Sequence, residues 1–250
     1  MRLLVPLAVM FALASAAPAA DDAAEAKAIV EKAIKARGDK PGDKHTAMTW
    51  KEKGTLGMGK VLELLYTADC AFQAPDKFRQ TTTISFGDAK GHGTTVINGE
   101  NAWQDEAEEV KKLTGGGLAR AQNGVYQFWV TSLTSLVTEK GFTLAIAKGK
   151  DVDKKPTVGV TVIRDKKPVT TLYFDRESGL LVKLEMTVKD GLEEGKELLW
   201  EVYFSDYKEA DGKKHFTKRK HVSNGKTVME YTLFDHTTAE KLDAKLFEKP

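Results

Sequence analysis

Apolar and polar side chains alternate along most of the chain, and this pattern predicts a protein built mainly from antiparallel strands. In the clearest example, apolar residues occupy every second position: Leu180, Val182, Leu184, Met186 and Val188. The positions between them hold Lys183, Glu185, Thr187 and Lys189, which predicts one buried and one solvated face. The same period predicts strands over residues 46–56, 60–72, 77–86, 91–97, 198–204, 216–222 and 227–234, with a short strand that reaches Trp103.

Two stretches have the spacing of amphipathic helices instead. Residues 21–37 carry apolar side chains at three- and four-residue intervals, and Gly38 marks the expected end. Residues 118–138 show a broken helical pattern, with large side chains at Val125, Phe128, Trp129, Leu133, Leu136 and Val137. Residues 115–117 are three glycines, which we interpret as a flexible connector before these helices.

The start of the chain has the pattern of a cleavable secretory signal. Arg2 precedes an apolar stretch over residues 3–13, and small residues fill positions 14–20. This apolar core is too short to cross a bilayer, which needs about 20 residues. We therefore predict a signal peptide over residues 1–20, a single domain over residues 21–250, and a periplasmic or secreted protein that does not span the membrane after cleavage.

Composition narrows the possible partners. The 250 residues include 38 Lys and Arg against 36 Asp and Glu, a net charge of +2, so nucleic acid is not an expected partner. Cys70 is the only cysteine of the sequence, which excludes an internal disulfide. Packing must therefore provide the stability.

A search for reactive groups predicts neither an enzyme nor a cofactor. The five histidines are scattered, no metal-binding motif occurs, and the Gly-x-Ser-x-Gly motif of hydrolases is absent. We interpret the acidic residues 105–109 as the solvated start of a helix, and the basic run 213–220 as a charged sheet edge. The aromatic residues, in contrast, exceed what a sheet with one covered face needs, although an ordinary helix-on-sheet core is the simpler explanation for any one of them.

Four short stretches together resemble the LolA/LolB-like family of periplasmic lipoprotein carriers. Residues 75–79 resemble the family's Pro-x-x-Phe-Arg strand, and residues 98–103 its Asp/Asn-Gly-x-x-x-Trp turn. Residues 175–180 resemble its Asp-x-x-x-Gly-Leu hairpin, and residues 242–247 its closing Leu-Asp-x-x-Leu-Phe. Two positions depart from the pattern: Ala74 replaces an arginine that holds the lid in well-known carriers, and a late proline is replaced within residues 215–217.

The resemblance implies a curved antiparallel sheet, an unclosed LolA-like half-barrel with covering helices. Its apolar cavity would hold a lipid or the acyl chain of a lipidated protein. On this interpretation six side chains line the cavity: Trp50, Phe78, Trp103, Phe128, Trp129 and Leu133. The alternative is a module that binds another envelope protein, or senses envelope stress, through a filled core without a ligand.

Overall fold

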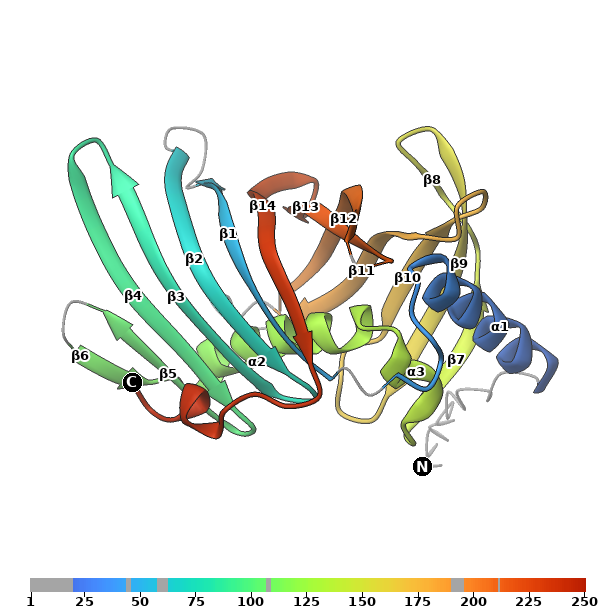
Figure 1. The fold of residues 1–250 in the computed structure, drawn as a ribbon, viewed down its shortest axis with the longest axis horizontal. Helices are drawn as coiled ribbons and strands as arrows, with labels where there is room; N and C mark the ends of the chain where they lie inside the picture. The colour runs from blue at the N-terminus through green and yellow to red at the C-terminus, as the bar shows by residue number, and fades with distance from the viewer. Residues whose placement is uncertain (1–19, 44–45, 58–62, 107–108, 190–195, 211) are drawn as a thin grey trace, which may run out of the picture.

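A computed structural model describes residues 20–43, 46–57, 63–106, 109–189, 196–210 and 212–250, so the predicted signal peptide lies outside the described residues except for Ala20. The described strands form one antiparallel sheet in the order β6-β5-β4-β3-β2-β1-β14-β13-β12-β11-β10-β9-β7, and β8 pairs with β9 (Figure 1). No pairing joins β6 to β7 in this part of the chain, so the sheet stays open. The predicted unclosed half-barrel is confirmed.

The strands follow the predicted alternation closely, and β3 has the predicted ends. Their bounds are β1 Ala47–Gly57, β2 Glu63–Gln73, β3 Lys77–Phe86, β4 Ala89–Asn98, β5 Asn101–Glu106, β6 Glu109–Lys112, β7 Phe142–Ala147, β8 Asp151–Val152, β9 Lys155–Arg164, β10 Thr170–Asp175, β11 Leu181–Lys189, β12 Glu197–Ala210, β13 Lys213–Ser223 and β14 Lys226–Ala239. The turn between β13 and β14 places Asn224 and Gly225 at φ +46° and +77°. Two successive positive φ values are those of a two-residue type I′ hairpin, as the Asn-Gly pair predicts.

The first helix confirms the sequence pattern. Helix α1 (Ala20–Ala36) buries Ala26, Val30, Ala33 and Ile34, and contacts β7, β9 and α3. Gly38 ends it at φ +87°, while the Asp39 N–H donates to the Ile34 carbonyl. A left-handed glycine with this backward hydrogen bond is the common C-terminal cap of a helix.

The covering helices differ from the prediction in where they begin and break. Helix α2 (Gly115–Thr131) crosses the sheet (Figure 1), and α3 (Thr134–Thr138) follows. The three glycines form the first turn of α2 rather than a connector, and the helix continues through Gly124. The break comes at Leu133, whose φ is +64°, and the hydroxyl of Ser132 donates to the Trp129 carbonyl just before it.

Two charged segments lie elsewhere than predicted. Asp105 pairs with Val110, and Glu106 with Glu109, in the hairpin of β5 and β6, so these three acidic residues are not a helix start; residues 107–108 lie outside the described residues. Charged side chains suit this hairpin because β6 is an edge strand, where charge discourages pairing with other chains. The basic run 213–220 falls in β13, which is not an edge but lies between β12 and β14.

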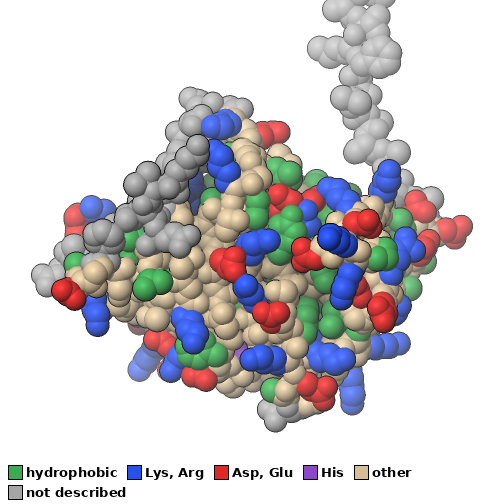
Figure 2. All heavy atoms as spheres, turned by 90° about the horizontal axis from the view of Figure 1, so that it is seen from above, with side chains coloured by type: hydrophobic (Ala, Val, Ile, Leu, Met, Phe, Trp, Pro, Cys, Tyr) green, Lys and Arg blue, Asp and Glu red, His purple; other side chains and the backbone are tan. Residues whose placement is uncertain are grey.

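The solvated face predicted for β11 is also partly wrong. Lys183 is only 7% exposed. Its Nζ lies 2.7 Å from a carboxylate oxygen of Glu185 and 2.5 Å from one of Glu201. These two ion pairs raise the pKa of Lys183 although burial opposes the charge. Elsewhere the charges are dispersed: on the face seen in Figure 2, positive and negative side chains intermix with hydrophobic ones.

The structure holds no helix, among the described residues, that combines the length and the apolar character needed to cross a membrane.

Candidate functional site

A cavity of about 690 Å³ lies between the concave face of the sheet and helix α2. This volume is within the range of about 300–1,000 Å³ typical of small-molecule sites. Apolar side chains from both layers line it: Leu56, Phe78, Ile97, Val125, Phe128, Met186, Val188, Leu198, Val228 and Met229.

Strand register decides which side chains face this cavity. Phe78 pairs with Ile97, and Ile97 pairs with Ala102, so these three residues share the concave face. Trp103 follows Ala102 and therefore lies on the outer face, opposite Val96. The C-terminal 3-10 helix η1 (Ala244–Phe247) contacts β3 and β4.

The six predicted lining residues fall into three groups. Phe78 and Phe128 line the large cavity. Trp50 lines a second cavity of about 70 Å³, which it shares with Phe128. The placement of Trp103, Trp129 and Leu133 is corrected, because they are not among the described residues that line either cavity. Contact of any of the six with a ligand stays a prediction.

Trp129 and Leu133 have other surroundings. The Trp129 ring packs edge-on against Phe142 at 5.0 Å, and the Arg164 guanidinium stacks 4.2 Å from the Trp129 ring centre. Its Nε1 donates to Glu139. Leu133 is fully buried at the break between α2 and α3. Both side chains therefore hold the helices in place instead of lining the cavity.

Phe128 separates the two cavities. Its ring stacks on Phe78 with ring centres 5.3 Å apart, and it also packs against Trp50 at 5.0 Å and Phe72 at 5.8 Å. Because Phe128 lines both cavities, it forms part of the wall between them. Through this side chain α2 packs on three aromatic residues of the sheet.

Glu52 is a buried carboxylate in the cavity wall that the sequence search did not single out. It is 2% exposed, and Trp50 Nε1 donates to its Oε1 at 2.7 Å. Tyr66 and Gln80 donate to its Oε2 at 3.3 Å. Burial raises its pKa although the hydrogen bond from Trp50 and the charge of Arg219 oppose the rise. The alternation of β1 places Glu52 in line with Trp50, a signal that could have found it.

Arg219, in the same wall, was assigned by sequence to a solvated edge. It is 1% exposed and sits among aromatic rings: its guanidinium carbon lies 4.6 Å from the ring centre of Phe128 and 5.4 Å from that of Phe204. The rings of Phe216 and Tyr231 lie within 5.9 Å. None of its three guanidinium nitrogens makes a well-aligned hydrogen bond in the described structure, and the Tyr231 hydroxyl interacts with the guanidinium only weakly.

A neutral polar pair adjoins Arg219. His221 Nε2 and the Tyr231 hydroxyl are 3.3 Å apart. Burial, with the nearby charge of Arg219, holds the pKa of His221 well below its usual value, and burial raises that of Tyr231. Both groups are uncharged near neutral pH. Among the described residues, no group of three or more His, Cys, Asp or Glu side chains is placed to hold a metal ion.

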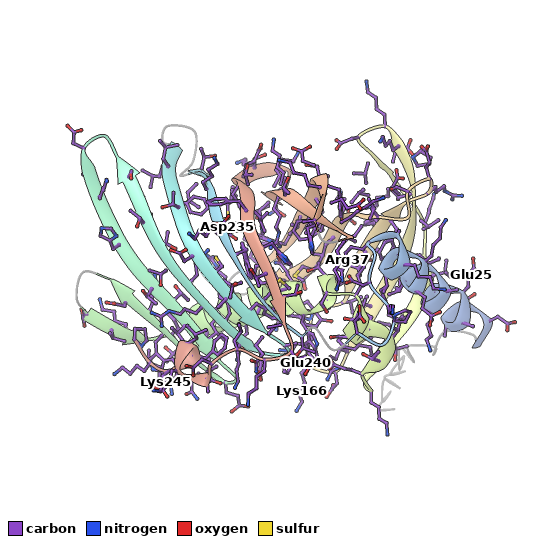
Figure 3. All side chains as sticks on the ribbon, in the orientation of Figure 1. Glu25, Arg37, Lys166, Asp235, Glu240 and Lys245 are labelled. Atoms are coloured by element: carbon purple, nitrogen blue, oxygen red, sulfur yellow. The ribbon has the colours of Figure 1, made fainter. Side chains whose placement is uncertain are left out.

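A polar cluster anchors the far end of α2 beside the small cavity. Arg37, labelled in Figure 3, donates from Nη1 to the Thr131 carbonyl at 3.2 Å and from Nη2 to the Ser132 carbonyl at 2.8 Å. Asp39 accepts from Arg37 Nε and lies 2.8 Å from Lys213 Nζ. The two nearby cations hold the pKa of Asp39 below its usual value although burial raises it. Arg37 thus ties the end of α1 to the last carbonyls of α2.

Histidines that are distant in sequence meet in this cluster. The rings of His215 and His236 are 4.2 Å apart, and both line the small cavity. Burial, together with His215 and Arg37, lowers the pKa of His236 to about 4. No local sequence pattern indicates this contact, because one ring comes from β13 and the other from β14.

Comparison with solved structures establishes the fold. A LolA superfamily protein from Nitrosomonas europaea superimposes with a TM-score of 0.58 at 14% identity, over 90% of this chain and 97% of that one. An outer membrane lipoprotein-sorting protein domain from Vibrio parahaemolyticus gives 0.56 at 14% identity, over 91% and 97%. A DUF1329 family protein from Desulfovibrio piger gives 0.58 at 10% identity, over 91% and 97%.

The amino-acid sequence itself matches no protein-family model and no curated protein. The chain therefore has a LolA-like fold, as its four short motifs suggest, while identities this low carry the fold alone.

Proposed function

We propose that this protein is an exported carrier that binds the acyl chain of a lipid or of a lipidated protein in the large cavity. The cavity of about 690 Å³ is the observation that carries the proposal. A filled core, which the alternative of a ligand-free interaction module requires, is difficult to reconcile with a cavity of this size. The name of the Vibrio parahaemolyticus domain, a lipoprotein-sorting protein, supports the same function.

The energetics favour an alkyl ligand. Each methylene group that leaves water contributes about 0.8 kcal/mol. Ten buried methylenes would contribute about 8 kcal/mol, from which the cost of losing translational and conformational freedom must be subtracted. A carrier needs binding that is tight enough to shield the chain and weak enough to release it. An apolar cavity without specific polar contacts to the chain meets both needs.

We propose no catalytic activity. Glu52 is the cavity residue best suited to acid–base chemistry, but Trp50, Tyr66 and Gln80 already donate to both of its oxygens. His221 is held neutral and is paired with Tyr231. These hydrogen bonds stabilise the wall of the cavity and leave neither group facing a substrate as a free base.

A chain-length series tests the proposal. The full chain is titrated with methyl esters of straight-chain fatty acids of increasing length, and calorimetry measures each affinity. We expect the affinity to rise about fourfold for each added methylene, the equivalent of about 0.8 kcal/mol, and then to level off when the cavity is full. Native mass spectrometry of protein purified from a cell envelope should also show co-purified lipid. Absence of binding for every ester, with no lipid recovered, would refute the carrier function and favour the interaction module.

A further inference from the structure

We propose that Arg219 binds the anionic head of an amphiphile, a carboxylate or a phosphate joined to the alkyl chain that the cavity holds. The inference rests on the proposed function, because the head is placed relative to a chain inside the cavity. It adds a ligand class, since an apolar cavity alone does not distinguish an acid from its ester.

The first observation is that no anionic group and no well-aligned acceptor is paired with the Arg219 guanidinium. Its three nitrogens are covered by protein and make no well-aligned hydrogen bond in the described structure. The Tyr231 hydroxyl interacts with the guanidinium only weakly and already pairs with His221. Glu52, in the same wall, does not serve as the acceptor, because none of the three nitrogens forms a hydrogen bond to it, and its oxygens accept from three other side chains. A buried charged donor without an acceptor is costly and uncommon in folded proteins. A ligand with an anionic oxygen would supply the missing acceptor.

The second observation comes from a neighbouring strand. Trp200 Nε1 is also covered by protein and has no hydrogen-bond partner in the described structure. Trp200 lines the same cavity, and its ring packs edge-on against His221, two residues from Arg219. Indole and guanidinium are both donors without acceptor capacity. The wall therefore has unsatisfied donors and calls for a ligand rich in acceptors.

The charges of the lining residues also favour an anionic ligand. Among the described residues that line the cavity, the cations are Arg120, Lys189 and Arg219, and Glu52 is the carboxylate. Three cations against one carboxylate leave the balance positive. Attraction between opposite charges is strong in such a poorly solvated site. A neutral lipid carries no net charge for this field to attract.

Phe128 controls access to the guanidinium. Its ring centre lies 4.6 Å from the guanidinium carbon, and the ring lines the cavity from the side of α2. An anionic head reaches Arg219 when this ring turns aside. Phe128 also lines the small cavity, which provides space next to the ring. The alkyl chain then lies along the apolar wall formed by Ile97, Met186 and Met229.

The test compares ligands with the same chain and different heads. The full chain is titrated with hexadecanoate, hexadecyl phosphate and methyl hexadecanoate, at a pH where both acids are ionised. We expect at least one anion to bind tenfold or more tightly than the ester. Arg219→Met should reduce this preference to less than twofold and leave the ester affinity within threefold of the unmodified protein. Arg219→Lys keeps the charge and should retain part of the preference.

Each result separates the two proposals. If the ester binds as tightly as both anions, the head-group site is refuted while the carrier function stands. A preference that persists in Arg219→Met refutes it as well. Absence of binding for all three ligands refutes both proposals. The comparison in the unmodified protein needs no variant, so it decides the matter even if Arg219→Met does not fold.

Discussion

Gly124 offers a way to fill the cavity without disturbing the core. It lies inside α2 and lines the large cavity, and a Cβ atom built there meets no atom within 4 Å beyond its chain neighbours and the adjoining helix backbone. A side chain at this position would extend into open space. Gly124→Trp should therefore block ligand binding, while Gly124→Ala changes the helix in the same place and leaves the cavity almost unchanged.

The expected changes in affinity and stability follow from the buried side-chain area and from helix propensity. A tryptophan side chain buries about 150 Å² or more, which at about 25 cal/mol per Å² corresponds to about 3–4 kcal/mol of contact that the alkyl chain would lose. The affinity for a long-chain ester should fall by two to three orders of magnitude. Gly124→Ala should keep the affinity and add up to about 1 kcal/mol of stability, because glycine is a poor helix residue.

The assay is calorimetric titration of each variant, together with urea unfolding. Gly117→Trp is the positional control: Gly117 also lies in α2, but it does not line the cavity, and a Cβ there meets only Leu113 at 4.0 Å. This control should bind like the unmodified protein. If Gly124→Trp folds and binds an ester as tightly as Gly124→Ala, the alkyl chain does not occupy this cavity, and the reasoning fails.

Three further predictions concern stability. Arg219→Met should leave the free energy of unfolding unchanged or raise it by up to about 2 kcal/mol, because removal of a buried charge without a well-aligned acceptor offsets the lost cation–π contacts. A fall of more than about 2 kcal/mol in urea unfolding would show a structural role instead. Arg37→Met should lower the free energy of unfolding by about 2–3 kcal/mol and speed hydrogen exchange at the end of α2. Lys27→Met, at an exposed ion pair, should lower it by less than about 0.5 kcal/mol, and equal losses for the two variants would contradict the anchoring role. Because burial lowers the pKa of His236 from 6.5 to about 4, the unfolded chain binds more protons between these pH values, and stability present above pH 6.5 should be lost as the pH falls toward 4. His236→Gln should reduce this loss by about 1–3 kcal/mol, and an unchanged slope of unfolding free energy against pH would show that His236 is not responsible.

The strands could be predicted because alternation is a local signal. Each strand that faces the core on one side shows its period in its own sequence, and turn residues such as Asn224 and Gly225 mark its ends. The Cys70 thiol is an example of a residue whose burial this pattern predicts: it lies on the inner face of β2, and burial raises its pKa well above the usual value. The fold class therefore follows from the sequence.

The residues that line the cavity were harder to predict from the sequence, because they depend on which face of each strand turns inward. Val96 and Ile97 are adjacent, and both are buried, because β4 has the cavity on one side and another covered surface on the other. With both faces covered, apolar character no longer identifies the inner face. For this reason the sequence alone does not distinguish Trp103, which lies on the outer face opposite Val96, from Phe78, which pairs with Ile97 on the inner face.

The polar residues of the site could not be predicted because their environment arises from distant parts of the chain. β1 pairs with β14, and β14 pairs with β13, so the first and the last strands lie side by side. Only this pairing aligns Gly54 of β1 with Tyr231 of β14 and Arg219 of β13. Judged by its neighbours in sequence, Arg219 belongs to a basic run, and such a run predicts a solvent-exposed side chain.

Gly54 shows why this part of the wall depends on strand pairing. A Cβ atom at Gly54 would lie 2.5 Å from the Tyr231 Cβ, so any larger residue would push β1 and β14 apart. The close approach brings the inner side of β1, with Glu52, near the buried guanidinium of β13, whose charge opposes the rise in the pKa of Glu52. The carboxylate, the unpartnered cation and the aromatic rings around them therefore come together only when both ends of the sheet have paired. It follows that the proposed head-group site belongs to the complete fold and cannot form in a fragment that lacks either β1 or β14.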